Sequence, residues 1–179
     1  MTYIPRYNPS PQDQGLIAWT CDPATQNTTQ IIPGAGQLMT AKLVLPVLST
    51  VTNIIMSIAT AGSALTSGQN FAGLYSPSGT LLSGTADQTT NWGSSGLKTI
   101  ALSSQQTNLP PGIYTVAFYA NGTTLPTLRI GTAGSSWPNA GLATANSRFG
   151  LANTGLTTAL PGTLGAISAN EFAWWIALS

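Results

Sequence analysis

Short apolar segments recur along this chain with turn residues between them, and this pattern restricts the fold more than any other feature. The dipeptides Pro-Gly, Ser-Gly and Asn-Gly that separate the segments are typical of tight turns. No long stretch has the sustained i, i+3, i+4, i+7 apolar spacing of an amphipathic helix. The sequence therefore predicts little helix and about ten short strands, over residues 15–20, 28–32, 37–48, 51–59, 70–75, 80–83, 97–102, 113–120, 125–130 and 172–178.

Alternation is clearest between Ile113 and Tyr119. Successive side chains of a strand point to opposite faces of its sheet, so Tyr114, Val116 and Phe118 share one face and the odd-numbered residues share the other. We expect the even-numbered set to face the core. An all-β chain with Gly- and Pro-rich turns indicates a sandwich or barrel, and this number of strands suits a jelly-roll-like β-sandwich.

The 179 residues are enough for one domain with a sizeable core. Prolines at positions 5, 9, 11 and 23 favour an extended conformation at the N-terminus. We therefore predict a Pro-rich arm or tether over residues 1–24 and a single β-sandwich domain over residues 25–179. Residues 131–169 are weakly patterned and rich in Gly, Ala, Ser and Asn, which indicates a functional surface or a subunit contact.

Charge is scarce, because only 5% of residues are Asp, Glu, Lys or Arg and the net charge is +1, against roughly 25% charged residues in a typical soluble domain. This balance argues against nucleic-acid binding and against a polybasic membrane patch. The most apolar stretch, residues 38–61, is interrupted by polar residues and Pro46, so no membrane insertion is expected. The start of the sequence also lacks the basic and apolar regions of a secretory signal peptide.

Catalytic chemistry is restricted by the absence of histidine. Without it a Ser-His-Asp or Cys-His arrangement is impossible and the commonest zinc ligand is missing, so we predict no metal site, no cofactor and no catalytic residue. The single cysteine, Cys21, cannot form an internal disulfide. A glycan hydrolase that uses two carboxylates remains the enzymatic alternative, and the acidic residues are Asp13, Asp22, Asp87 and Glu171. Asp22 precedes Pro23, where an Asx turn explains it.

Two tryptophans, Trp92 and Trp137, lie in polar loops of the sequence. An exposed indole can stack on the C–H face of a sugar while neighbouring amides and hydroxyls bind its OH groups. We therefore predict a glycan-binding site in which Trp92 and Trp137 are accompanied by Asn91, Ser135, Ser136 and Asn139. The alternative is that the two rings pack over the end of the sandwich or against another subunit.

The segment 172–178 is the most apolar strand and contains two adjacent tryptophans, Trp174 and Trp175. Their side chains point to opposite faces, so one is buried within the protomer and the other needs a second cover, such as a neighbouring subunit. We predict an oligomer interface at Trp174 and Trp175 and a closed homotrimer.

Several segments resemble a known family, over about residues 15–179. The likeness is carried mainly by residues 59–82, and also by Thr85-Ala86-Asp87-Gln88 with Trp92, by Gly96-Leu97-Lys98, and by residues 109–117. These segments resemble the β-sandwich domain that ends minor tail and fibre proteins of phages infecting actinobacteria.

The resemblance implies a virion structural protein, trimeric and not enzymatic, whose exposed domain binds the host cell surface as a tail fibre tip or adhesin. A host cell-wall glycan is the receptor class we expect, and the N-terminal arm would contact other virion proteins. Such domains usually end a longer polypeptide with a shaft or baseplate segment, which this sequence lacks. The alternatives are therefore a separately encoded capsid decoration or head-fibre protein, or an excised fragment of a longer chain.

Overall fold

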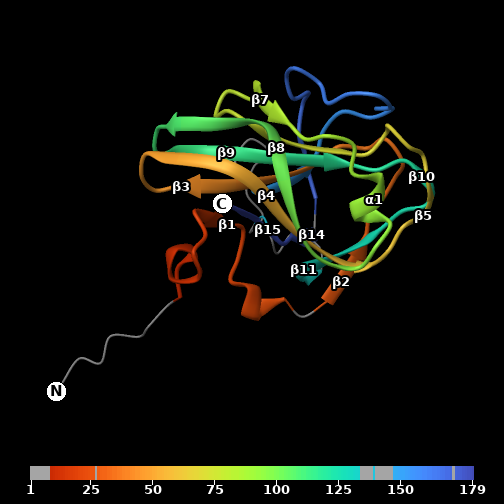
Figure 1. Ribbon diagram of the computed structural model, residues 1–179, viewed down its shortest axis with the longest axis horizontal. Coiled ribbons are helices and arrows are strands. Elements are labelled where there is room, and N and C mark those ends of the chain that lie inside the picture. Colours follow the sequence, from red (N-terminus) through yellow and green to blue (C-terminus); the bar gives the residue numbers. More distant parts are fainter. Residues whose placement is uncertain (1–8, 27, 134–138, 140–146, 171) are drawn as a thin grey trace.

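A computed structural model describes residues 9–26, 28–133, 139, 147–170 and 172–179 of the chain. Within these residues the regular structure is almost entirely β-strand, and every strand pairing is antiparallel. Two larger sheets form the layers of a sandwich (Figure 1). The predicted all-β sandwich is confirmed.

The first layer, sheet A, has seven strands in the order β1-β15-β4-β11-β14, with β2 also paired to β11 and β8 to β4. Its strands are β1 (Ala18–Trp19), β2 (Thr28–Ile31), β4 (Ser49–Thr60), β8 (Gly96–Leu109), β11 (Thr127–Ala133), β14 (Phe172–Trp174) and β15 (Ile176–Leu178). β8 also reaches the other layer, because Leu102 forms a bridge with Thr85 and the N–H of Ser104 donates to Ser83 Oγ.

The second layer, sheet B, has six strands in the order β13-β12-β3-β9-β6-β7. They are β3 (Met39–Leu45), β6 (Phe71–Tyr75), β7 (Leu81–Gly84), β9 (Gly112–Tyr119), β12 (Phe149–Leu151) and β13 (Ser168–Ala169). A separate pair joins β5 (Ser63–Leu65) and β10 (Gly122–Thr124). The helical elements are the 3-10 turns η1 (Pro11–Gln14) and η2 (Pro23–Thr25) and the single-turn α1 (Thr89–Trp92). Each of the ten predicted ranges contains a strand, whereas the short strands β5, β10, β12 and β13 were not predicted.

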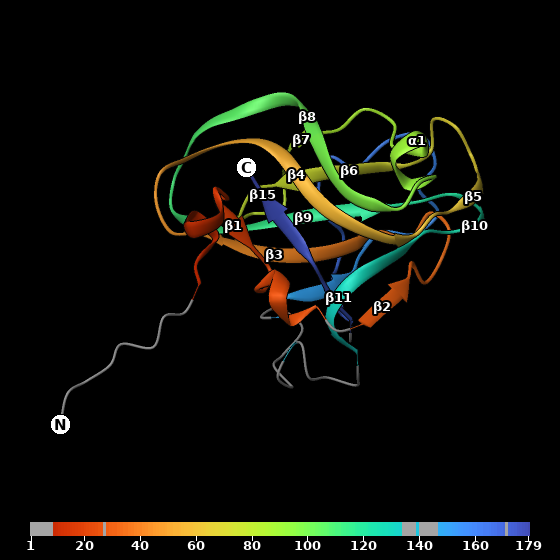
Figure 2. The same cartoon turned by 60° about the horizontal axis from the view of Figure 1, so that its bottom comes forward.

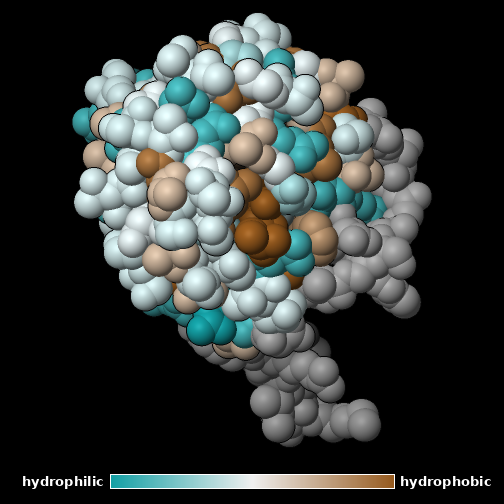
Figure 3. Space-filling view, turned by 90° about the vertical axis from the view of Figure 1, so that its right-hand side faces the viewer, coloured by the Kyte–Doolittle hydropathy of each residue, from teal (hydrophilic) through white to brown (hydrophobic). Residues whose placement is uncertain are grey.

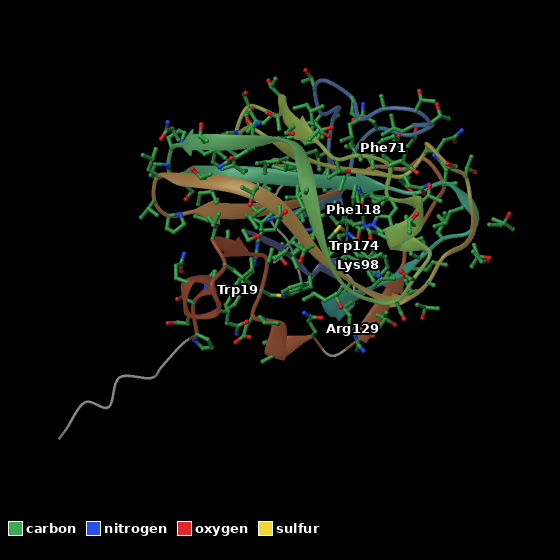
Figure 4. The ribbon with its side chains drawn as sticks, viewed as in Figure 1. Trp19, Phe71, Lys98, Phe118, Arg129 and Trp174 are labelled. Atoms are coloured by element: carbon green, nitrogen blue, oxygen red, sulfur yellow. The ribbon has the colours of Figure 1, made fainter. Side chains whose placement is uncertain are left out.

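The main core lies between the two sheets and is built from alternate residues of their strands. Tyr114, Val116 and Phe118 of β9 are all at most 2% exposed and belong to this core, which confirms the predicted face. Phe118 meets Trp174 of the opposite sheet edge-to-face, with ring centroids 5.6 Å apart (Figure 4). Contacts of this kind, together with aliphatic side chains, hold the layers together.

The outer face of sheet B is buried as well, over part of its area. Tyr75 and Tyr119 lie there under residues 152–164, whose leucines pack on them. Their hydroxyls donate to the backbone carbonyls of Pro161 and Thr157, each at 3.0 Å, and burial raises the pKa of Tyr119 to about 12. This part of the weakly patterned region therefore covers the outer face of the sheet.

The start of the described chain lies on the sandwich. β1 pairs with β15, with Ala18 opposite Leu178 and Trp19 opposite Ala177 (Figure 2). Residues 9–24, predicted as part of an arm, therefore contribute an edge strand to sheet A. Residues 1–8 lie outside the described residues. Within the described chain no helix has both the length and the apolar character needed to cross a membrane.

Candidate functional site

Trp92, the first tryptophan predicted to bind a glycan, is buried. It ends α1, is 1% exposed and belongs to the core between the sheets. The neighbouring Asn91 donates from its amide to Gln88 Oε1 at 2.7 Å. The prediction that Trp92 stands in an exposed loop is wrong, because the single helical turn directs the indole inward. Trp92 therefore stabilises the fold and offers no ring face to a sugar.

Asn139, predicted for the same site, also has a structural role. It is 4% exposed, and its amide nitrogen donates to the carbonyls of Phe149 and Asn170. Its Oδ1 accepts from the N–H groups of Arg148 and Phe149. The prediction that Asn139 binds a glycan is therefore wrong, since the side chain is buried and its polar atoms bind separate backbone segments. Trp137, Ser135 and Ser136 lie outside the described residues.

The two adjacent tryptophans of the C-terminal strands point to opposite faces, as predicted, but both are covered by this chain itself. Trp174 is fully buried between the sheets, and Trp175 on the other face is 4% exposed. Leu16, Trp19 and Cys21 pack beside Trp175, and the indole Nε1 donates to the carbonyl of Cys21 at 3.1 Å. The predicted subunit interface at Trp174 and Trp175 is therefore wrong, because the N-terminal segment already supplies the missing cover.

The three described carboxylates all accept hydrogen bonds from nearby backbone. Asp13 accepts from the N–H and hydroxyl of Ser10, and Asp22 accepts from the N–H of Ala24, as its predicted Asx turn requires. Asp87 accepts from the N–H of Asn70 at 3.1 Å. Burial raises the pKa of Asp87, but hydrogen bonds from the Thr89 side chain and from backbone N–H groups outweigh it and hold the pKa below its usual value. Glu171, the fourth, lies outside the described residues.

A hollow of about 660 Å³, here called the edge groove, runs between the N-terminal segment and strands β3 and β9. Most of its lining is apolar and comes from Pro11, Ile17, Trp19, Leu43, Val44, Pro46 and Ile113. Its polar side chains are Gln12, Lys42 and Arg148. Its volume lies within the range of roughly 300–1,000 Å³ that small-ligand sites occupy.

Trp19 is the aromatic side chain of the edge groove. The pairing of β1 with β15 places it at the edge of sheet A, and it is half-buried (Figure 4). One part of it packs in the cluster around Trp175, and it also lines the groove. A half-exposed indole beside polar side chains is the arrangement that the sequence predicted around Trp92, but it occurs at a different residue.

Two cationic side chains line the edge groove with Trp19. Arg148 is exposed, its Nη2 donates to the carbonyl of Thr20, and its guanidinium carbon lies 5.3 Å from the centre of the Phe149 ring. The backbone N–H of Lys42 donates to the carbonyl of Arg148 at 2.8 Å, so the two residues are neighbours. None of the three described carboxylates lines the groove.

A second hollow of about 310 Å³ shares Lys42 with the edge groove. Lys42 lies opposite Thr115 in the β3–β9 register, and both line this hollow. The other lining residues are Pro77, Ser78, Gly79, Leu164, Gly165 and Ile167. Lys42 therefore lines both hollows.

Sequence reasoning missed this site because its residues are far apart in the chain. Trp19, Lys42 and Arg148 form no local motif. The one signal in the sequence was Trp19, which lies close to the Pro-rich start of the chain. A tryptophan in an edge strand is often partly exposed, so this position could have indicated a binding surface.

Large apolar residues are few on the rest of the surface that the structure describes. Figure 3 shows that the end of the molecule carrying β5 and β10 is mostly neutral or hydrophilic, with small apolar areas. The exposed large apolar side chains of the described chain are Ile31, Val44, Val47, Leu48, Leu97 and Ile113. Val44 and Ile113 are register partners on β3 and β9, and Val47 and Leu48 follow in the β3–β4 turn. These four form one aliphatic end of the sandwich.

Comparison with known proteins gave no relative from which a role could be inferred: no protein-family model and no curated protein matched the chain. The assignment of a role depends on the geometry of the edge groove and on the resemblance noted in the sequence.

Proposed function

We propose that this chain is a non-enzymatic structural protein of a bacteriophage particle, and that its sandwich domain attaches the particle to a glycan on the host cell surface. The observation that carries the proposal is the edge groove, in which the half-buried Trp19 lies with Gln12, Lys42 and Arg148. The resemblance to phage tail and fibre domains supports the same reading.

The groove has the chemical groups that sugar recognition uses. The indole face of Trp19 can pack on the C–H groups of a sugar ring, and apolar side chains such as Ile17 line the groove beside it. The amide of Gln12 and the cationic groups of Lys42 and Arg148 can donate to hydroxyl or acidic oxygens. Binding of this kind needs neither a metal ion nor a catalytic residue.

The roles of the carboxylates support a binding protein over a hydrolase. Asp13, Asp22 and Asp87 each accept a hydrogen bond from a backbone N–H group of a local turn or loop. A glycosidase needs two carboxyl groups on either side of the scissile bond, roughly 5–9.5 Å apart. The hydrogen bonds of these three side chains are sufficient to account for their presence in the fold.

Replacing Trp19 with leucine is expected to weaken binding of the folded protein to actinobacterial host cells by roughly thirtyfold, since removing an anchor of this kind costs about 2 kcal/mol or more. Leucine keeps the apolar cover over Trp175 and removes the aromatic face. Binding of labelled protein to cells would measure the effect. As a control, Phe71→Leu changes a half-buried aromatic residue outside the groove and should leave binding unchanged. Equal binding by the Trp19 variant and the parent would contradict the proposal that the edge groove binds the glycan.

A homotrimer is the expected assembly. At the aliphatic end of the sandwich, Val47 and Leu48 lie outside the edge groove and are each more than half exposed, so they offer apolar contact area to a second copy. Light scattering is expected to give three times the chain mass of 18.4 kDa. Replacing Val47 and Leu48 together with serine should lower this mass, because the two side chains lie in a turn and can be changed without opening the core. A parent protein that remains a monomer at every concentration contradicts the prediction.

A capsid decoration or head-fibre protein is the second candidate. The same aliphatic end favours it, because an apolar surface at one end of a sandwich suits attachment to another virion protein. Electron microscopy of whole particles with the chain labelled would separate the two candidates, since one predicts density at the tail tip and the other predicts density on the head.

A further inference from the structure

We propose that Thr20 is the positioning residue of the edge groove, and that its buried hydroxyl holds the indole of Trp19 in the place where the glycan binds. The inference rests on the proposed function and adds the residue through which the fold fixes this side chain. The backbone pairing at Thr20, its burial and its position next to Trp19 each support it.

Thr20 pairs with Ile176 through its side chain as well as its backbone. The register of β1 on β15 places the two residues opposite each other. A hydrogen-bonded pair in an antiparallel sheet exchanges two bonds between backbone groups. Here the N–H of Thr20 donates to the carbonyl of Ile176 at 2.9 Å, but the N–H of Ile176 donates to Thr20 Oγ1 at 3.1 Å. The threonine hydroxyl therefore replaces the Thr20 carbonyl as the acceptor in this pair.

The same hydroxyl and the released carbonyl connect Thr20 to both sheets. Oγ1 donates to the carbonyl of Trp174 at 2.7 Å, so this one atom contacts the residues on either side of Trp175, between β14 and β15 of sheet A. The carbonyl of Thr20 accepts from Arg148, the residue before β12 of sheet B. Thr20 is 3% exposed, so water does not readily replace a partner lost here. The chain is therefore fixed at the position that follows β1.

The bonds of Thr20 act on Trp19 because the two residues are neighbours in an extended segment. Side chains alternate along such a segment, so Thr20 points toward the interior while Trp19 and Cys21 pack beside Trp175 on the other face. β1 itself has only two residues and lies at the edge of sheet A beside β15 (Figure 2). A strand this short makes few backbone hydrogen bonds, so the position of the indole depends on the bonds of Thr20.

Thr85 has the same arrangement at a strand end outside the groove. Its N–H donates to the carbonyl of Ala72 at 2.9 Å, and the N–H of Ala72 donates to Thr85 Oγ1 at 3.2 Å. This hydroxyl also donates to the carbonyl of Ala86 at 2.8 Å, and Thr85 is 6% exposed. Replacing either threonine with valine removes a buried hydroxyl of the same kind, so the two variants separate a role in the groove from a role in the fold alone.

The test is binding of the labelled full chain to actinobacterial host cells, with Thr20→Val, Thr20→Ser and Thr85→Val beside the parent. Valine has the shape of threonine without the hydroxyl, so Thr20→Val leaves the N–H of Ile176 without its acceptor. If the indole is then in place in about a tenth of the molecules, binding weakens by about tenfold, because the apparent affinity scales with the competent fraction. Thr20→Ser keeps the hydroxyl, and both it and Thr85→Val should bind like the parent.

The double variant Trp19→Leu with Thr20→Val shows whether Thr20 acts through Trp19. The effects of independent residues on a free energy add, whereas the effects of coupled residues do not. The double variant should therefore bind as weakly as Trp19→Leu alone and no more weakly. A further loss of about tenfold in the double variant would show that Thr20 affects binding by another route, which contradicts the inference.

Fluorine NMR of protein labelled with 5-fluorotryptophan reports the position of the indole in the absence of any ligand. The signal of Trp19 is the one that is missing from Trp19→Leu. It should shift or broaden in Thr20→Val and stay unchanged in Thr20→Ser and Thr85→Val. The signal of Trp92 in the core should be the same in all of them, which shows that the fold is intact. An unchanged Trp19 signal in folded Thr20→Val contradicts the inference.

If Thr20→Val does not fold, amide hydrogen exchange in the parent makes the test. The N–H groups of Thr20 and Ile176 should then exchange as slowly as those of the long central strand β4, and exchange at the rate of an unprotected peptide would contradict the inference. The outcomes also separate it from the proposed function. If Thr20→Val binds like the parent while Trp19→Leu binds more weakly, only this inference fails. If Trp19→Leu also binds like the parent, the edge groove is not the binding site and both proposals fail.

Discussion

Replacing Trp92 with alanine is expected to lower the free energy of unfolding by about 3–5 kcal/mol, as for other large aromatic residues in protein cores. The side chain is 1% exposed and lies in the core between the sheets. Its backbone carbonyl also accepts from the N–H of Gly62 at 2.9 Å, so disorder in α1 would spread to residues near β5. Urea denaturation followed by fluorescence or circular dichroism would measure the loss.

Trp92→Phe provides the matched comparison. The indole Nε1 of Trp92 has no hydrogen-bond partner within the described chain, so phenylalanine removes an unpartnered polar group as well as some volume. Its cost should therefore be clearly smaller than that of alanine. Glycan binding by the folded fraction of either variant should equal that of the parent. A stable Trp92→Ala protein with weakened binding would contradict the structural role of Trp92 and would show that this residue takes part in glycan binding.

Replacing Asn70 with alanine is expected to cost roughly 2–4 kcal/mol, because each buried polar group left without a partner costs about 1–3 kcal/mol. Asn70 is fully buried. Its amide donates to the carbonyl of Thr66 at 2.7 Å and to Thr89 Oγ1 at 2.8 Å, and its Oδ1 accepts from the N–H of Asn121 at 3.0 Å. One side chain therefore connects the loop before β6, the helical turn α1 and the loop before β10.

Asn153→Ala is the control for this prediction. Asn153 Oδ1 accepts one exposed hydrogen bond, from the N–H of Gly165 at 2.9 Å. Its replacement should cost no more than about 1 kcal/mol, since water can replace the lost partner. Thermal unfolding of the two variants side by side makes the comparison. Equal stability losses would show that the Asn70 hydrogen bonds contribute no more than an exposed one.

The sandwich was predictable because its longer strands carry local signals. The alternation from Ile113 to Tyr119 identified the core face of β9, and turn residues bounded the other strands. The short strands β5, β10, β12 and β13, each of two or three residues, show no period and were missed. The polar sequence around Trp92 indicated a loop, whereas the burial of that side chain depends on contacts with distant parts of the chain.

The site was less predictable than the fold, for a physical reason. Sequence patterns show which face of a strand is apolar, but they do not show which segment covers that face. One of the two adjacent tryptophans was expected to need a neighbouring subunit as its cover, and instead the residues around Trp19 cover Trp175. That same placement leaves part of Trp19 lining a groove with Lys42 and Arg148, a proximity that only the three-dimensional structure provides.

The position of β15 between β1 and β4 affects how this protein folds during its synthesis on the ribosome. Both neighbours are synthesised early, and sheet A stays incomplete until residues 176–178 have emerged. Until then the edge of β4 at Ile54, Ile55 and Met56 lacks one of its partners, and β1 has no strand to pair with. Because Trp19 lies on β1, a chain terminated before residue 176 would not form the groove wall. Formation of the edge groove is thereby restricted to translation products that include this strand.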